Sequence, residues 1–262
     1  MARVKIWAIC LTIASAGLAN AQGAEDLAKK LSNPVSDLIS VPFQLNYDDR
    51  IGLNDSGARW TLNMQPVIPF SLNDNWNLVS RTIVPVVMTD GIPPGSGSHT
   101  GLGDTVQSFF FSPKAPTAGG WIWGAGPVFL VPTSTDDRFG AGDWGVGLTG
   151  VALRQSGPLT YGALANHVVD INGTTDIRST FLQPFVSYTT PSAWTFTANT
   201  ESTYDWEAEQ WSVPVNVLAS KLVTFGERPV SIGAGIRNWV ESSDGGPEGL
   251  GVRFSVTFLF PK

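Results

Sequence analysis

The chain ends in a stretch, residues 250–260, in which apolar side chains alternate with small or polar ones. Side chains of a β-strand point to opposite faces in turn, so this stretch predicts a strand with one apolar and one polar face. Such a strand is typical of the last strand of an outer-membrane β-barrel, whose outer face meets lipid. The last strand of a soluble sandwich has the same period, so this stretch alone leaves both folds open.

The first 21 residues predict export. Arg3 and Lys5 precede the apolar run 6–13, and Ala19-Asn20-Ala21 has the small-residue pattern of a signal-peptidase site. We therefore expect a signal peptide at 1–21 and a mature chain from Gln22. The single cysteine, Cys10, lies inside the signal, so neither a disulfide nor a lipoprotein anchor is expected.

Charge and hydropathy exclude several classes of protein. Without Arg3 and Lys5 the chain has 14 basic and 22 acidic residues, a formal charge of −8. This balance argues against nucleic acid as a partner. No later stretch reaches the roughly 18 consecutive apolar residues of a membrane helix, so any crossing of a membrane would use strands.

The remaining chain divides into a short arm and a long region of period two. Residues 22–40 place Leu27, Leu31 and Val35 on one helical face, and Asn33-Pro34 is expected to restart the helix there. This amphipathic arm is expected to plug the barrel mouth or lie at its periplasmic rim; binding a partner is a third option. Residues 41–262 give twelve strand candidates, an even number as in single-chain bacterial barrels. They are 41–49, 58–71, 76–88, 104–112, 121–132, 144–155, 159–168, 178–189, 194–203, 211–224, 230–240 and 250–260.

Connections and tryptophans favour the barrel over the sandwich. Tight turns, such as 73–75 and 156–158, alternate with mostly longer loops, such as 89–103 and 133–143, which is the asymmetry of outer-membrane barrels. Tryptophans fall at strand ends, as interfacial girdles require. The expected girdle comprises Trp60, Trp76, Trp121, Trp123, Trp144, Trp194 and Trp211, with Trp206 and Trp239 also at the long-loop ends.

Prolines inside the expected strands argue against regular pairing. They are Pro66, Pro69, Pro85, Pro127, Pro184 and Pro214. Each removes a ladder donor that lipid cannot replace, so some of these strands are expected to bulge, bend or end early.

Several runs resemble a known family: LSNPVSDLISVPFQLNYD, LNMQPVIPFSLNDNWNLVSRTIVPV, GLGDTVQSFFFSPK, GPVFLVPTSTD, FLQPFVSY and the terminal LFP. Together they are similar to the outer-membrane barrels grouped under the phenol-degradation MetA-pathway name, often called "transporter" or, mistakenly, "neuromedin U". The resemblance covers nearly all of the mature chain. It implies an outer-membrane channel or uptake role, and its name suggests an apolar or aromatic solute. It brings no catalytic residues.

Strand register gives candidate lumen residues. Polar residues that alternate with lipid-facing ones must point inward, because a charge on the lipid face costs a few kcal/mol near the midplane. The candidates are Arg59, Asn63, Gln65, Arg81, Gln183, Asn199, Glu201, Asn216, Arg237 and Arg253. Arg237, Arg253 and Glu201 are expected at similar heights. They form either a constriction that selects solutes or an ion-pair network that fills a narrow lumen.

Other functions remain as alternatives. Outer-membrane phospholipases use Ser, His and Asn, but Asn166 and His167 are adjacent and so point to opposite faces. His99 lies in the Gly/Ser-rich loop and is expected to be exposed. Acidic loop residues either bind divalent cations that bridge lipopolysaccharide, bias the solutes admitted, or only keep the loops soluble.

The sequence therefore predicts an all-β protein of the bacterial outer membrane: a transmembrane antiparallel up-and-down barrel with a short N-terminal helix. We expect a non-enzymatic, porin-like channel for passive uptake of small solutes, without catalytic residues, cofactor or metal site. Its expected partners are outer-membrane lipid, lipopolysaccharide and the solute. A structural or adhesive barrel, or a lipid hydrolase, is the alternative.

Overall fold

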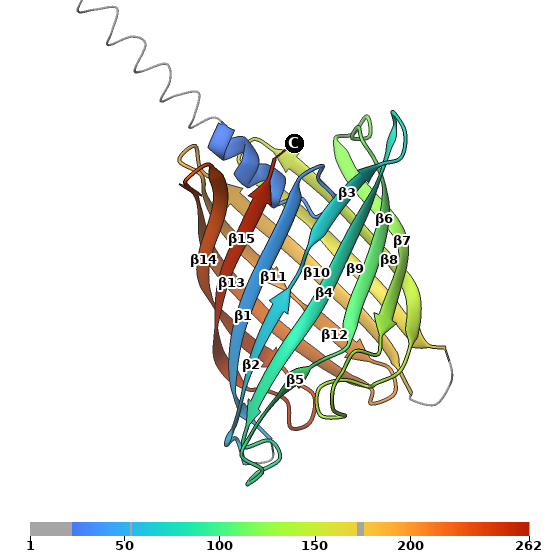
Figure 1. Cartoon of the computed structure of the whole chain (residues 1–262), viewed down its shortest axis with the longest axis vertical. Helices are drawn as coiled ribbons and strands as arrows, with labels where there is room; N and C mark the ends of the chain where they lie inside the picture. Colours follow the sequence, from blue (N-terminus) through green and yellow to red (C-terminus); the bar gives the residue numbers. More distant parts are fainter. Residues whose placement is uncertain (1–22, 53, 172–175, 262) are drawn as a thin grey trace, which may run out of the picture.

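The alternating segments pair into one antiparallel sheet that closes on itself (Figure 1). The computed structural model describes residues 23–52, 54–171 and 176–261, so the expected signal peptide lies outside the described residues. The sheet closes where β1 pairs with β15, from Ile39 opposite Phe260 to Tyr47 opposite Val252. The segments are β1 (Ile39–Ile51), β2 (Gly57–Met64), β3 (Val67–Ser71), β4 (Trp76–Asp90), β5 (Ser98–Leu102), β6 (Thr105–Pro113), β7 (Trp121–Val131), β8 (Gly145–Ser156), β9 (Leu159–Asp170), β10 (Arg178–Thr189), β11 (Trp194–Thr200), β12 (Ser202–Asp205), β13 (Gln210–Phe225), β14 (Arg228–Glu241) and β15 (Gly249–Phe260).

In three places, two successive segments together form one barrel strand: β2 with β3, β5 with β6, and β11 with β12. The strand β4 pairs with β2 and β3 on one side and with β5 and β6 on the other, and β13 pairs with both β11 and β12. The barrel therefore has twelve strands, which confirms the predicted all-β fold and strand number. Among the described residues, no helix is long and apolar enough to cross a bilayer.

The breaks within barrel strands lie at prolines. Pro66 separates β2 from β3, and the break between β5 and β6 lies opposite Pro85, whose carbonyl accepts the Gly103 N–H at 2.9 Å. Glu201, between β11 and β12, donates its N–H to the Pro214 carbonyl at 3.3 Å. Proline has no N–H with which to donate a hydrogen bond to the neighbouring strand, so the hydrogen-bond ladder between the strands is interrupted at each of these positions. Pro69 and Pro184, by contrast, keep their strand partners Val79 and Ala163.

One strand segment was missed by the sequence pattern. The segment β5 lies within the range predicted as the loop 89–103, because its glycine and serine content hides any apolar alternation. It pairs with β4, where His99 is opposite Thr89. His99 is therefore a half-buried strand residue, and the expectation of an exposed loop histidine was wrong.

The N-terminal arm lies across the short-turn mouth of the barrel, beside the C-terminus (Figure 1). Its helix spans residues 23–31 and is followed by turns, so the helix expected to restart at Pro34 does not form. Instead the Asn33 side-chain oxygen accepts the Val35 N–H at 3.0 Å, which closes an Asx turn. Val35 and Leu38, both 4 % exposed, then point into the barrel.

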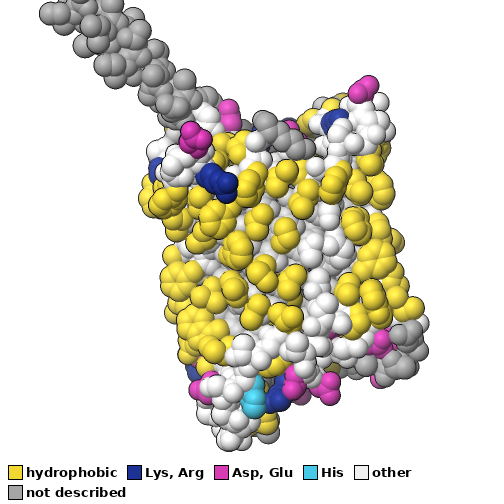
Figure 2. Space-filling model, viewed as in Figure 1, with side chains coloured by type: hydrophobic (Ala, Val, Ile, Leu, Met, Phe, Trp, Pro, Cys, Tyr) yellow, Lys and Arg dark blue, Asp and Glu magenta, His cyan; other side chains and the backbone are white. Residues whose placement is uncertain are grey.

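The outer surface carries an apolar belt between two charged ends (Figure 2). Trp121, Trp123 and Trp194 are exposed at the short-turn end, and Trp144 and Trp211 at the long-loop end. Trp60 and Trp76 are half-buried, against Tyr47 at 4.7 Å and Trp123 at 5.8 Å between ring centroids. The positions suit interfacial anchoring, which stays a prediction for these seven residues.

Candidate functional site: the polar lumen

The inside of the barrel contains two cavities that share one residue, Glu201. The outer cavity, of about 560 Å³, lies toward the long loops. The inner cavity, of about 280 Å³, extends to the N-terminal arm. Every predicted lumen residue lines one of them: Arg59, Asn63 and Arg237 the outer, Gln65, Arg81, Gln183, Asn199, Asn216 and Arg253 the inner, and Glu201 both.

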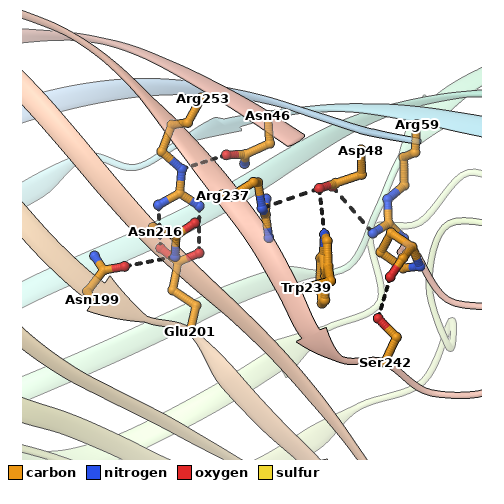
Figure 3. Close-up of polar contacts among 11 residues, drawn as sticks. Asn46, Asp48, Arg59, Asn199, Glu201, Asn216, Arg237, Trp239, Ser242 and Arg253 are labelled. Carbon is orange, nitrogen blue, oxygen red and sulfur yellow. Dashed lines mark hydrogen bonds and ion pairs between the residues drawn. The ribbon is translucent and has the colours of Figure 1, made fainter. Parts of the chain in front are cut away.

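A strut, defined here as the ion pair of Arg253 with Glu201 (Figure 3), lies where the two cavities meet. Arg253 of β15 donates two hydrogen bonds to Glu201, at 2.9 and 2.6 Å, and its Nε donates to Asn46 Oδ1 at 2.7 Å. Two-pronged pairing of this kind is among the strongest polar contacts in proteins. Glu201 comes from a barrel strand three places from β15, a quarter of the way around the twelve-stranded barrel, so the pair bridges this part of the wall and narrows the lumen there.

A second charge cluster lies on the outer side of the strut. Asp48 of β1 accepts the Trp239 Nε1–H at 2.8 Å and lies 3.3 Å from Arg237 Nε and 3.7 Å from an Arg59 nitrogen. The Arg237 guanidinium also lies over the Trp239 ring, 4.8 Å from its centroid. Asp48 is therefore shared by two arginines and an indole (Figure 3).

A glycine permits this cluster to form. Gly251 of β15 is opposite Arg237 on one side and next to β1 on the other. A Cβ at Gly251 would lie 2.9 Å from Arg237 Cγ and 3.1 Å from Asp48 Oδ1. A Cβ there would also clash with the Tyr47 carbonyl oxygen, so Gly251 leaves free the space beside which Asp48 and Arg237 meet.

Trp239 does not lie where its position near a strand end predicted. It was grouped with the tryptophans of the long-loop girdle, but it points into the lumen and binds Asp48. The alternation of side chains along β14 could have predicted this orientation, because Trp239 is two residues from Arg237 and must share its face. Its position near a strand end does not distinguish a lumen tryptophan from an interfacial one.

A loop folds into the long-loop mouth and contributes to the outer cavity. Asp104, 8 % exposed, accepts the backbone N–H groups of Ser134 and Gly142, both at 3.1 Å. This fixes the loop 132–144 so that Arg138 and Phe139 line the cavity. Arg138 is also paired with Asp136 at 2.7 Å, and this side-chain hydrogen bond holds the pKa of Asp136 below its usual range.

We expect Asp104→Ala to release this loop. Two backbone donors would lose a charged acceptor, which costs about 2 kcal/mol of local stability. Limited trypsin digestion of the folded barrel measures the effect, because Arg138 is a cleavage site within the loop. The variant should be cut there, while the wild type and Asp90→Ala, which only removes a contact to Ser98, resist. Equal resistance of Asp104→Ala would show that the carboxylate does not anchor the loop.

His167 lies on β9, at the outer surface of the barrel wall. It faces outward, with Nδ1 2.8 Å from the Thr180 hydroxyl, and Trp206 Nε1 donates to the same oxygen at 2.8 Å. Its contacts among the described residues, Thr180 and Trp206, include neither a serine nor a carboxamide. The described residues also contain no cluster of three or more potential metal-binding side chains.

Comparisons with known proteins show the fold. The sequence matches no family model, and no match is found among curated proteins. The structure is similar to an outer-membrane channel from Pseudomonas putida, with a TM-score of 0.67, 15 % identity and coverage of 85 % of this chain and 94 % of that one. It also resembles the outer-membrane phospholipase of Salmonella typhi, with a TM-score of 0.49, 12 % identity and coverage of 85 % and 91 %.

The chain is therefore an outer-membrane β-barrel by fold. The MetA-pathway resemblance stays a prediction.

Proposed function

We propose that the protein is an outer-membrane channel through which small solutes diffuse. The observation that carries this proposal is the pair of polar cavities, of about 560 and 280 Å³, that meet at Glu201 inside a closed barrel. Cavities lined largely by polar side chains can hold water and small solutes, which a lumen filled by packed side chains could not. The similarity to an outer-membrane channel supports the same conclusion.

Diffusion through this lumen would depend on its side chains. A solute arriving from the long-loop end would first occupy the outer cavity and exchange its water for Asn46, Thr61 and Asn63. It would then pass the Arg253–Glu201 strut and reach the inner cavity. Charged rings at narrow points set which solutes pass in other channels, and the strut is the equivalent point here.

Single-channel recording in a planar bilayer tests the proposal. We expect stepwise conductance, and Arg253→Ala is expected to enlarge the steps because the shortened side chain no longer reaches Glu201. Phe254→Leu is the matched control, since the adjacent residue lies on the lipid face and should leave the steps unchanged. Recordings should be made with the full chain and with residues 23–38 deleted. Silence from both proteins would contradict a channel and favour a structural barrel.

A further inference from the structure

The wall of the lumen has an excess of positive charge, although the chain as a whole is acidic. Four arginines line the cavities from the barrel strands, Arg59, Arg81, Arg237 and Arg253, against Asp48 and Glu201. At the mouth, Arg138 is paired with Asp136 at 2.7 Å, and Asp244 also lines the outer cavity, so the mouth adds no positive charge to that of the barrel wall. Of the acidic residues, Asp48, Glu201 and Asp244 line the two cavities.

The two lumen carboxylates are shared unequally among the lumen arginines. Glu201 gives both oxygens to Arg253, whose Nε is satisfied by Asn46. Arg59 and Arg237 share Asp48, at 3.7 and 3.3 Å. Among the described contacts, the outer cluster thus has two guanidinium groups for one carboxylate.

Three buried polar atoms around the outer cavity have no hydrogen-bond partner. They are the Nε atoms of Arg59 and Arg237 and the hydroxyl of Thr89. The Arg237 Nε has an ion-pair contact with Asp48 but no hydrogen bond. Arg237 and Thr89 are 6 % and 5 % exposed, and all three side chains line the cavity. Buried polar groups without a partner are costly, so this wall is suited to a ligand that accepts hydrogen bonds.

Apolar side chains line the same cavity. Ile51, Val87, Ile92 and Phe139 contribute to it alongside the arginines. Ile51 and Val87 are buried barrel residues, and Phe139 is fixed by the loop that Asp104 anchors. The cavity therefore combines cationic donors with an apolar surface, which suits an amphipathic anion rather than an inorganic ion.

We propose that the outer cavity is a binding site for a small organic carboxylate with a short apolar body. The carboxylate accepts hydrogen bonds from Arg59, Arg237 and Thr89, and the apolar body contacts Ile51, Val87 and Phe139. Guanidinium and carboxylate groups have matching planar geometry, and an excess of positive charge in a narrow passage raises the local concentration of anions. The inference rests on the proposed channel function and names its solute class.

Three probes of nearly equal size and different charge test the proposal: butanoate, butanamide and butylammonium. The full chain is reconstituted in liposomes, and the uptake of each probe is measured by vesicle swelling. We expect butanoate to enter several-fold faster than butanamide, and butylammonium to be slowest. Arg59→Gln should reduce the preference for butanoate several-fold, whereas Arg59→Lys should retain part of it. Arg178→Gln is the charge-matched control, because Arg178 lies outside the lumen over the Trp206 ring.

Binding measured separately distinguishes failure of the site from failure of the channel. Calorimetric titration of the detergent-solubilised full chain with butanoate should give saturable binding that Arg59→Gln weakens and Arg178→Gln leaves unchanged. Saturable binding of butanoate without uptake of any of the three probes would contradict the channel but support the site. Uptake without any preference for butanoate, or fastest uptake of butylammonium, would overturn the carboxylate site while leaving the channel intact. Heat-dependent migration in gel electrophoresis verifies that each variant is folded.

Discussion

Deletion of residues 23–38 is expected to turn a channel that the arm obstructs at its short-turn end, and that conducts in brief steps, into one that conducts continuously. In the structure this arm lies across the mouth and forms part of the wall of the inner cavity, through Leu31, Asn33 and Ser36 among others. The polar lumen otherwise continues to this end of the barrel, where Ser187, Thr195 and Thr257 line the cavity. We therefore expect the mean conductance to rise several-fold.

The contacts of the arm explain why it holds the mouth closed. Val35 packs in a buried cluster with Val79, Phe110 and Leu153 of the barrel wall. Ala28 and Leu38 pack in a second cluster with Leu222 and Leu259. Gln155 also donates to the Lys29 carbonyl at 2.9 Å. Each buried aliphatic side chain contributes about 1.5–3 kcal/mol by leaving water, so the arm is held chiefly by its apolar side chains.

A disulfide provides the converse test. A Cβ at Gly124 would lie 3.2 Å from Val35 Cγ1, so cysteines at positions 35 and 124 are within reach of each other. The sequence has no other cysteine after Cys10, which keeps the chemistry unambiguous. Oxidised protein with both substitutions should conduct less than wild type, and reductant should restore the current. Equal currents for the deletion, the disulfide and the wild type would show that the arm is no barrier.

Glu201→Ala is expected to lower the free energy of unfolding by about 3 kcal/mol, because it leaves a buried arginine without its counter-charge. Arg253 is 3 % exposed, and its two outer nitrogens both bond to Glu201. Asn46 would remain as its acceptor but bears no charge. Glu201→Gln should cost less, since the amide oxygen still accepts one hydrogen bond. Urea unfolding in lipid vesicles, followed by tryptophan fluorescence, measures these differences.

A double variant separates the pair from its surroundings. Replacing both partners, as Glu201→Leu with Arg253→Met, removes the buried charges together, and such replacements are often neutral. We expect the double variant to be more stable than the sum of the two single losses predicts. Thr203→Ala, on the same face and strand, is the control for a truncation that leaves no charge unpaired. Strictly additive losses would mean that the strut contributes little to folding.

The sequence alone determined which segments form the strands of the barrel wall and which face of each strand points inward. Alternation is a local property, because the strand backbone turns successive side chains to opposite faces wherever it is extended. Residues 250–260 and their counterparts could therefore be assigned an inner and an outer face, and the strand number followed from the turns between them. The lumen candidates were chosen in this way, from the alternation of side chains along each strand and the cost of a charge in lipid.

Only the tertiary structure decided which inner residues meet. Arg253 and Glu201 lie on strands three places apart, and Asp48 meets Arg237 beside Gly251, which has no side chain to occupy that space. These contacts depend on the tilt and stagger of the strands and on the width of the barrel, which no single strand encodes. The loop held by Asp104 and the arm in the mouth are likewise fixed by residues far away in the sequence. The alternation along a strand determines whether a side chain points into the lumen or toward lipid. Which other side chain it contacts inside the lumen depends on how the whole sheet closes.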